Sequence, residues 1–372
     1  MRTFGVEEEL LLVDARTGIP VAAAPRILQR VRRGGGGGSA AALPVLEAEM
    51  QQEMLEVVGA PCATVDEVAA GIARGRRHAD AAAQSVGARA VALATCPVPV
   101  TPHHSPSPRY AEMMRRYGTT ARSSLTCGFH VHVSVESPEE GVGVLDRIRE
   151  WLPTLLALTG NSPFWDGADT GYASYRNDVW SRWPCAGPNP VFGSEQAYRQ
   201  HELSLLATGT LLDAGMLYFD ARLSRHHPTV EVRVADVCLR ESDAVTVAAL
   251  CRGLVESAAS EWRSGIAPVG SDQRMLRLAT WRAALTGVRG DHVDAATGSP
   301  RTPQEAVADL LAYAGPGLAV TGDYERVEQG VRDILRRGTG ADWQRQQFDR
   351  RGSAASVVHA AVDLMADYAP AA

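Results

Sequence analysis

The sequence lacks the features that mark several other classes of protein. Its six cysteines are scattered and form no C-x-x-C pair, which predicts reduced thiols rather than a disulfide framework or a zinc knuckle. No segment approaches the roughly 18 consecutive apolar residues of a transmembrane helix. Met1 and Arg2 lead directly into an expected strand, so we expect no signal peptide. Together these absences predict a cytoplasmic protein.

The chain also lacks an excess of positive charge. Its net charge of −6 and its pI of about 6.0 argue against a general binder of nucleic acid or of acidic membranes. With 372 residues, of which 45% are hydrophobic and 22% charged, the composition is that of an ordinary globular protein with ample core. The length fits two domains or one large unit of helices and strands.

Four apparent strands carry a polar pair at alternate positions within an apolar run. The pairs are Glu7 and Glu9 in FGVEEELLLVD, His130 and His132 in CGFHVHVSV, Asp220 and Arg222 in LYFDARLS, and Glu231 and Arg233 in TVEVRVAD. Because side chains alternate along a strand, each pair faces one side of its sheet. A solvated sheet face explains any single pair, but the four pairs together predict one cavity for divalent metal and phosphate.

The segment Glu47–Val58, EAEMQQEMLEVV, is rich in carboxylates and fits either a helix or a strand. A helix would place Glu49, Glu53 and Glu56 on one face, whereas a strand would separate Glu49 from Glu56. An exposed acidic helix face is the alternative to a functional cluster at this place.

Periodicity and turn residues predict most of the remaining elements. We expect helices over 65–84, 109–117, 138–159 with a kink at Pro153, 196–206 and 242–261, and a mainly helical chain from there to Ala372. Residues 88–96 predict a buried strand. The segment Arg225–Pro228 predicts the turn of a hairpin between the strands of Asp220 and Glu231.

Two irregular stretches carry different predictions. The segment Arg30–Ser39 combines three arginines with five glycines, but no Gly-Lys-Ser/Thr follows, so it predicts a mobile loop rather than a phosphate cradle. The segment Asn161–Gly193 is rich in tryptophan and tyrosine, which predicts a packed wall of a site rather than disorder.

The residue types of the polar pairs indicate their chemistry. Many carboxylates with few imidazoles suit Mg²⁺ or Mn²⁺, which takes oxygen ligands in octahedral geometry. Neighbouring arginines bind phosphate oxygens. A zinc hydrolase is the main rival, since His-x-His with a carboxylate can hold zinc, but the surplus of glutamates favours several magnesium ions. Cys127 and His130 fall on opposite faces of their strand and form no nucleophile pair.

Several of these stretches resemble a known family. CGFHVHVSV and TVEVRVAD resemble the metal-binding strand and the Glu-x-Arg strand of the glutamine synthetase superfamily. The closer resemblance is to the glutamate–cysteine ligase type 2 family, or carboxylate–amine ligases. It rests on TFGVEEELLLVD, NSPFWDGADTGYASYRNDVW, FDARLSRHHPTVEVRVAD and GTGADWQRQ, and extends to about Val358.

This resemblance implies an α+β, glutamine synthetase-like catalytic fold. A curved, mainly antiparallel sheet is expected to form a funnel backed by helices, with ATP and amino-acid substrates entering from opposite ends. The family also implies a single catalytic domain over residues 1–372, with the sheet core at about 2–240 and a helical part at about 242–372.

The resemblance also assigns roles to individual residues. The metal-ligand positions correspond to Glu7, Glu9, Glu49, Glu56, His130 and Glu231. Arg233 matches the arginine that faces the transferred phosphoryl group, and Arg176 and Arg222 are expected to bind the nucleotide or a carboxylate. His132 shares a face with His130 and joins Arg233 and Glu231 as a catalytic residue. The run WRAALTGV from Trp281 departs from the family's Asn-Arg-Trp-Arg-Ala-Ala-Arg pattern, so no substrate contact is carried over there.

The implied function is amide formation that depends on ATP and on Mg²⁺ or Mn²⁺. A carboxylate, from glutamate or a related amino acid, attacks the γ-phosphoryl group of ATP to give an acyl phosphate, and an amine then attacks the acyl carbon. An ATP-dependent phosphotransferase without an amine acceptor and a zinc amidohydrolase without ATP are the alternatives. We expect no nucleic-acid or membrane partner. The identity of the amine and the oligomeric state stay open, with a homodimer as one alternative.

Overall fold

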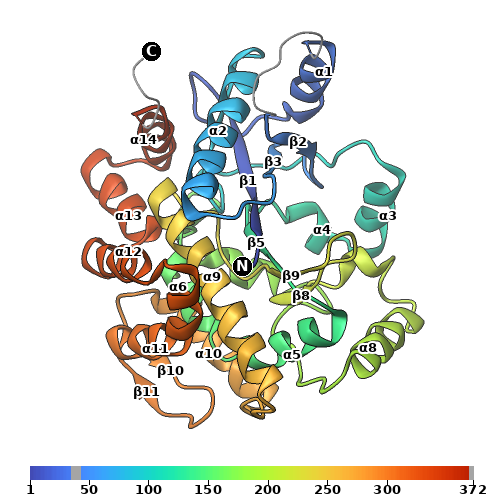
Figure 1. Cartoon of the computed structure of the whole chain (residues 1–372). Coiled ribbons are helices and arrows are strands. Elements are labelled where there is room, and N and C mark those ends of the chain that lie inside the picture. The colour runs from blue at the N-terminus through green and yellow to red at the C-terminus, as the bar shows by residue number, and fades with distance from the viewer. Residues whose placement is uncertain (35–42, 368–372) are drawn as a thin grey trace.

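An open, seven-stranded sheet runs through the centre of the computed structural model, which describes residues 1–34 and 43–367 (Figure 1). The strand order is β2-β3-β1-β5-β9-β8, with β4 also paired to β1, and every one of these pairs is antiparallel. The strands are β1 (Phe4–Asp14), β2 (Val45–Ala48), β3 (Met54–Val58), β4 (Ala88–Val91), β5 (Phe129–Ser134), β8 (Ala221–Leu223) and β9 (Thr229–Val232). The expected mainly antiparallel sheet is confirmed.

Helices surround this sheet and make up most of the second half of the chain. They are α1 (Ala24–Gly34), α2 (Val65–Gln84), α3 (Pro108–Tyr117), α4 (Thr119–Ser123), α5 (Pro138–Ile148), α6 (Leu152–Thr159), α7 (Tyr175–Trp180), α8 (Glu195–Ala207), the 3-10 helix η1 (Ala214–Met216), α9 (Glu241–Arg263), α10 (Gln273–Thr286), α11 (Pro303–Thr321), α12 (Tyr324–Arg337), α13 (Gly340–Arg351) and α14 (Ala354–Asp367). Two short hairpins complete the described elements: β6 (Phe164–Trp165) with β7 (Ala168–Asp169), and β10 (His292–Val293) with β11 (Pro300–Arg301).

The two faces of the sheet differ because apolar and polar residues alternate along its strands. On one face, Phe4, Val131 and Val230 are buried in a large core together with residues of α2, α5 and α9. In Figure 1, α2 and α9 lie to one side of β1 and β5, whereas α3 and α4 lie to the other side. The helix-covered face therefore supplies stability, and the opposite face is left for polar side chains.

Glu8 shows how the helix-covered face accommodates a charge. It points away from Glu7 and Glu9 and makes a buried ion pair with Arg76 of α2, with 2.6 Å between Nη2 and Oε1. Arg76 also donates from Nη2 to the carbonyl of Cys238 at 2.6 Å. A buried charge needs a hydrogen-bonded partner, and α2 provides it here.

Three sequence-based expectations need correction or refinement. Helix α1 continues to Gly34, so Arg30 and its arginine neighbours are helical rather than part of a loop; the glycines that follow lie outside the described residues. The ambiguous segment Glu47–Val58 forms the strands β2 and β3 rather than a helix. The expected long helix 138–159 is divided into α5 and α6, and Pro153 stands in the first turn of α6, where its missing N–H costs nothing.

Most of the remaining expected elements agree closely with the structure, but the expected strand 88–96 is shorter, since β4 ends at Val91. Helix α2 spans 65–84 as expected, α9 begins at Glu241, and β8 and β9 form the hairpin that turns at Arg225–Pro228. No strand of the main sheet follows Val232 among the described residues. The single domain stays a prediction. Among the helices of 1–34 and 43–367, none is long and apolar enough to cross a membrane.

Candidate active site

The polar face of the sheet forms the floor of a cavity of about 340 Å³. Side chains of α3, α7 and the hairpin turn between β8 and β9 form its walls. Nine of the residues predicted from the sequence line it: Glu7, Glu9, Glu49, Glu56, His130, His132, Arg222, Glu231 and Arg233. Segments from four distant parts of the chain therefore meet at one place, but the prediction that all four polar pairs face it is wrong for Asp220, which does not line this cavity.

Strand register brings these side chains together. Glu7 lies directly opposite His130, and Glu9 lies opposite Glu56. On the next strands, Glu231 lies opposite both His132 and Arg222. Directly opposed residues have Cβ atoms about 4.5–5.5 Å apart, so the polar pairs of neighbouring strands form one continuous cluster.

Three overlapping groups in this cluster have the spacing of a metal site. The groups are Glu7, Glu56 and His130; Glu7, His132 and Glu231; and Glu9, Glu49 and Glu56. In each group, one ligand atom from every residue lies within 4.8 Å of the others. Two groups mix carboxylates with an imidazole and the third holds carboxylates alone. This donor set is rich in oxygen and fits Mg²⁺ or Mn²⁺ better than a closed zinc site.

The carboxylates of the third group repel one another. Burial, together with repulsion from Glu9, raises the pKa of Glu49 to about 7. Burial and repulsion from Glu49 also raise the pKa of Glu56 well above its usual value. A divalent cation between these carboxylates would relieve the repulsion, so their electrostatics agree with their spacing.

The two imidazoles are held in place by polar neighbours. His130 Nδ1 lies 3.3 Å from Glu7 Oε2, and burial and the charge of Arg233 lower the pKa of His130. A neutral imidazole is the form that binds a metal. His132 has its Nδ1 2.9 Å from the hydroxyl oxygen of Thr229 and its Nε2 3.4 Å from Glu7 Oε1. The hydroxyl and the carboxylate together set the orientation of its ring.

Two arginines stand beside the carboxylates. Arg222 contacts Glu231 through two nitrogens, with Nε 2.7 Å from Oε2 and Nη2 3.3 Å from Oε1, and Arg233 Nη1 contacts the same carboxylate. Burial opposes ionisation of Glu231, but the two guanidinium groups outweigh it and hold its pKa below the usual range. The sequence contains no lysine. A basic side chain that binds phosphate here, other than a histidine, is therefore an arginine.

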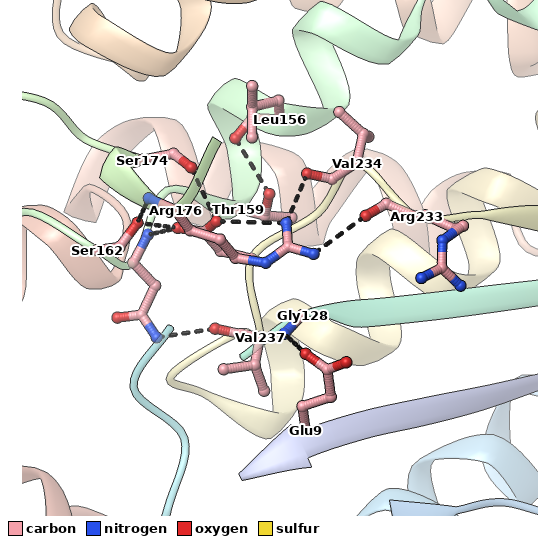
Figure 2. A network of polar contacts seen from close by, with 12 residues as sticks. Glu9, Gly128, Leu156, Thr159, Ser162, Ser174, Arg176, Arg233, Val234 and Val237 are labelled. Carbon is pink, nitrogen blue, oxygen red and sulfur yellow. Dashed lines mark hydrogen bonds and ion pairs between the residues drawn. The ribbon is translucent and has the colours of Figure 1, made fainter. Parts of the chain in front are cut away.

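Arg176 does not line the cavity and lies behind it. Its guanidinium donates to the carbonyls of Val234 and Arg233 at 3.2 and 3.3 Å and lies 3.8 Å from Asp236 Oδ1 (Figure 2). Gly128 permits this placement, because a Cβ there would collide with the Arg176 guanidinium. These contacts support the segment that follows β9 and carries Arg233, and they give no support to the predicted nucleotide contact of Arg176, which stays a prediction.

The aromatic-rich segment is anchored next to Arg176. Asp236 accepts hydrogen bonds from the backbone N–H of Asn161 at 2.9 Å and from the hydroxyls of Ser162 and Ser174 at 2.7 and 2.8 Å. Gln344, in the late GTGADWQRQ stretch, donates to the Asn161 side-chain oxygen at 2.7 Å. Stretches far apart in the sequence therefore meet in one polar network behind the site, and only Trp180 of this segment reaches the cavity wall.

The sequence profile of the glutamate-cysteine ligase family 2 matches residues 3–360. The chain belongs to this family. One relative, provisionally named glutamate–cysteine ligase 2-1 of Paenarthrobacter aurescens (strain TC1), is 50% identical over 99% of this chain and 96% of its own length. Another, provisionally named glutamate–cysteine ligase 2 of Streptomyces coelicolor (strain ATCC BAA-471 / A3(2) / M145), is 49% identical over 97% of this chain and 98% of its own length. Membership confirms the expected enzyme class, a ligase of the glutamate–cysteine ligase type.

Solved structures agree with this membership at the level of the fold. The glutamate–cysteine ligase of Francisella tularensis in complex with AMP has a TM-score of 0.70 at 12% identity, over 98% of this chain and 88% of that one. A bifunctional glutathione synthetase from Pasteurella multocida has a TM-score of 0.67 at 15% identity, over 99% of this chain and 52% of that one. The expected glutamine synthetase-like ligase fold is thereby confirmed.

Several further residues of this member of glutamate-cysteine ligase family 2 line the cavity without having been predicted. They are Arg109, Tyr110, Tyr218, Arg225, His226 and His227, together with smaller neighbours. The hairpin turn at Arg225–His227 could have been found from the sequence, because it joins two strands that both carry site residues. Arg109 gives no such signal, since it reaches the cavity from α3 and is paired with Asp213 at 2.7 Å.

Proposed function

We propose that this protein is an ATP-dependent carboxylate–amine ligase that forms an amide bond through an acyl phosphate. Glutamate or a related amino acid is the carboxylate donor, and an amine is the acceptor. The observation that carries the proposal is the meeting, in one cavity, of oxygen-rich ligand groups with the guanidinium groups of Arg222 and Arg233. Membership in glutamate-cysteine ligase family 2 and the fold shared with a relative that binds AMP support ATP as the phosphoryl donor.

The metal ligands in this proposal are the carboxylates of the three groups and one of their two imidazoles: Glu7, Glu9, Glu49, Glu56, His130 and Glu231. Mg²⁺ or Mn²⁺ bound there would offset the charge of the phosphates and polarise the oxygens of the γ-phosphoryl group. The raised pKa of Glu49, about 7, supports the presence of a cation, because these carboxylates lack enough positive charge of their own.

The arginines supply directed positive charge at the phosphates. The Arg222 guanidinium is fixed by its two contacts with Glu231, and the Arg233 side chain by its contact with the same carboxylate. A guanidinium held in one orientation can donate two parallel hydrogen bonds to a phosphoryl group and stabilise the charge that develops during transfer. We assign His132 to the same catalytic group because its ring orientation is fixed beside Glu7.

A phosphate-release assay with hydroxylamine tests the proposal. Hydroxylamine is a small neutral nucleophile that converts an acyl phosphate into a hydroxamate with release of phosphate. A ligase yields ADP, free phosphate and hydroxamate in equal amounts when ATP, glutamate and hydroxylamine are all present. A phosphotransferase would form ADP without an amine and release no free phosphate, and a zinc amidohydrolase would turn over without ATP; either result would exclude the proposed function.

We place this reaction in the cytoplasm, where ATP is available. All six cysteines are free, which suits a reducing compartment. The predicted partners are small molecules only, and a homodimer remains a prediction that size measurement in solution would test.

A further inference from the structure

A second cavity, of about 180 Å³, neighbours the active-site cavity. Its walls come from α7, from α10, from the residue that precedes β8, and from Tyr172 and residues 186–188. Trp180 contributes to the walls of both cavities, so a molecule in the smaller cavity is close to the proposed site of phosphoryl transfer. The smaller cavity has about half the volume of the larger one, which suits a small molecule.

Asp220 lines this cavity and carries a buried carboxylate oxygen that has no hydrogen-bond partner among the described residues. It stands beside Arg233 across the hairpin, because the Arg233 backbone N–H donates to the Asp220 carbonyl at 2.8 Å. The residue is 6% exposed, and the carboxylate oxygen in question is Oδ2. Burial raises the pKa of Asp220 to about 7, against the opposing charges of Arg176 and Arg277. A buried carboxylate that lines a cavity and lacks a partner is suited to a ligand that donates hydrogen bonds or carries positive charge.

Arg277 brings the opposite charge to the same cavity. It projects from α10, and it makes no ion pair or hydrogen bond with any residue of 1–34 or 43–367. Asp220 and Arg277 line one cavity yet lie too far apart for an ion pair, since no nitrogen of Arg277 is within 4.0 Å of the Asp220 oxygens. The indole rings of Trp180 and Trp281 supply apolar walls. The Asp220 carboxylate can pair with the ammonium of an α-amino acid, and the Arg277 guanidinium can pair with its carboxylate.

We infer that this cavity binds the charged α-carbon end of an amino-acid substrate, with its ammonium on Asp220 and its carboxylate on Arg277. The inference rests on the proposed ligase function and names two residues that determine which substrates that ligase accepts. Both the glutamate donor and an amino-acid acceptor carry this charged end. The experiment is therefore designed to show which of the two substrates the cavity binds.

Two pairs of substrates probe the two charges. For the donor, hydroxamate formation is compared between glutamate and glutarate, which lacks the ammonium. For the acceptor, amide formation with glutamate is compared between cysteine and cysteamine, which lacks the carboxylate. The variants are Asp220→Asn, which keeps the shape and removes the charge, and Arg277→Gln. Arg274→Gln is the matched control, because Arg274 is an exposed arginine of the same helix that does not line the cavity.

We expect kcat/KM for the zwitterionic substrate to fall about 10- to 100-fold in the variants, as for loss of a hydrogen bond to a charged group. If the cavity holds the donor, Asp220→Asn abolishes the preference for glutamate over glutarate. If it holds the acceptor, Arg277→Gln abolishes the preference for cysteine over cysteamine and leaves hydroxamate formation intact. Arg274→Gln should leave both preferences unchanged. If both preferences survive both substitutions, the inference is wrong.

Calorimetric titration with glutamate and with cysteine tests the cavity without turnover. Binding of one of them should weaken about 10- to 100-fold in Asp220→Asn and in Arg277→Gln but not in Arg274→Gln. If the unmodified protein forms no hydroxamate yet shows this pattern of binding, the proposed function fails and the amino-acid site stands. If hydroxamate forms but the titrations of the variants match those of the unmodified protein, the ligase stands and the site is refuted.

Discussion

The substitution Arg233→Lys tests whether this side chain acts on the phosphoryl group during its transfer. Arg233 contacts Glu231, and the carboxylates of Glu9 and Glu7 also surround it, so its guanidinium stays charged and in place. Lysine keeps the charge that balances these carboxylates but loses the planar fork that contacts two oxygens at once. Loss of one directed donor to developing charge lowers turnover by roughly 10²–10³, or about 2.7–4 kcal/mol. The affinity for ATP should change far less, because several charged groups of the cavity contribute to the binding of ATP before the transfer begins.

The assay measures hydroxamate turnover and ATP binding by titration on the same preparation. Arg222→Lys is the matched comparison, since Arg222 contacts the same carboxylate, with Nε 2.7 Å from Glu231 Oε2. We expect a smaller loss of turnover for Arg222→Lys than for Arg233→Lys. Equal losses of turnover and of ATP affinity in Arg233→Lys would make Arg233 a ground-state anchor. Equal losses of turnover in the two variants would show that neither guanidinium makes contacts that form only in the transition state.

Four further predictions follow from the site and its surroundings. Exhaustive chelation should abolish ligase activity and Mg²⁺ or Mn²⁺ should restore it; restoration by zinc alone would contradict the assigned donor set. Glu231→Gln should lower turnover by about two to four orders of magnitude, and also lower the Tm, because it removes the shared counter-ion of two arginines; an unchanged Tm would argue against that ion pairing. The pKa of Asp220, raised from 3.8 to about 7, disfavours its charged form in the folded state, so stability is lost as pH rises through this window. Asp220→Asn should therefore be more stable than the unmodified protein at pH of about 8, by on the order of 2–4 kcal/mol, with the difference vanishing near pH of about 4; parallel curves of Tm against pH would contradict this. Gly128→Ala should destabilise the protein by about 1–3 kcal/mol, because its Cβ meets the Arg176 guanidinium and comes within 3.1 Å of His130 Nε2; a neutral effect would mean that Arg176 can move freely.

The substitution Glu231→Gln shows what the contacts in the structure add to a sequence pattern. From the sequence, Glu231 is one of many carboxylates, and its neutralisation is expected to relieve repulsion. In the structure, Arg222 and Arg233 both contact Glu231, and its pKa lies below the usual range. Whether a carboxylate repels or balances its surroundings depends on which charges lie within a few ångströms, and composition does not determine this.

Figure 2 illustrates the same lesson for Arg176. Its place in a stretch typical of the family predicts a ligand contact, which stays a prediction, and the structure adds that its guanidinium binds main-chain carbonyls behind the site. The direction of a long side chain depends on where the fold places its partners. Gly128, which leaves room for this arginine, lies 48 positions away in the sequence.

The sequence by itself determined which side chains of β1, β5 and β9 share a face, because alternation along a strand is a local property. It also determined the family, the antiparallel sheet, the boundaries of α2 and the chemistry of the donor set. Only the tertiary structure decided the register that sets Glu7 opposite His130 and Glu9 opposite Glu56. It also decided that Glu49 and Glu56, separated along one hairpin, belong to a single ligand group. Register arises from contacts between segments that are distant in the sequence, and a shift of one residue would turn every side chain of a strand to the other face.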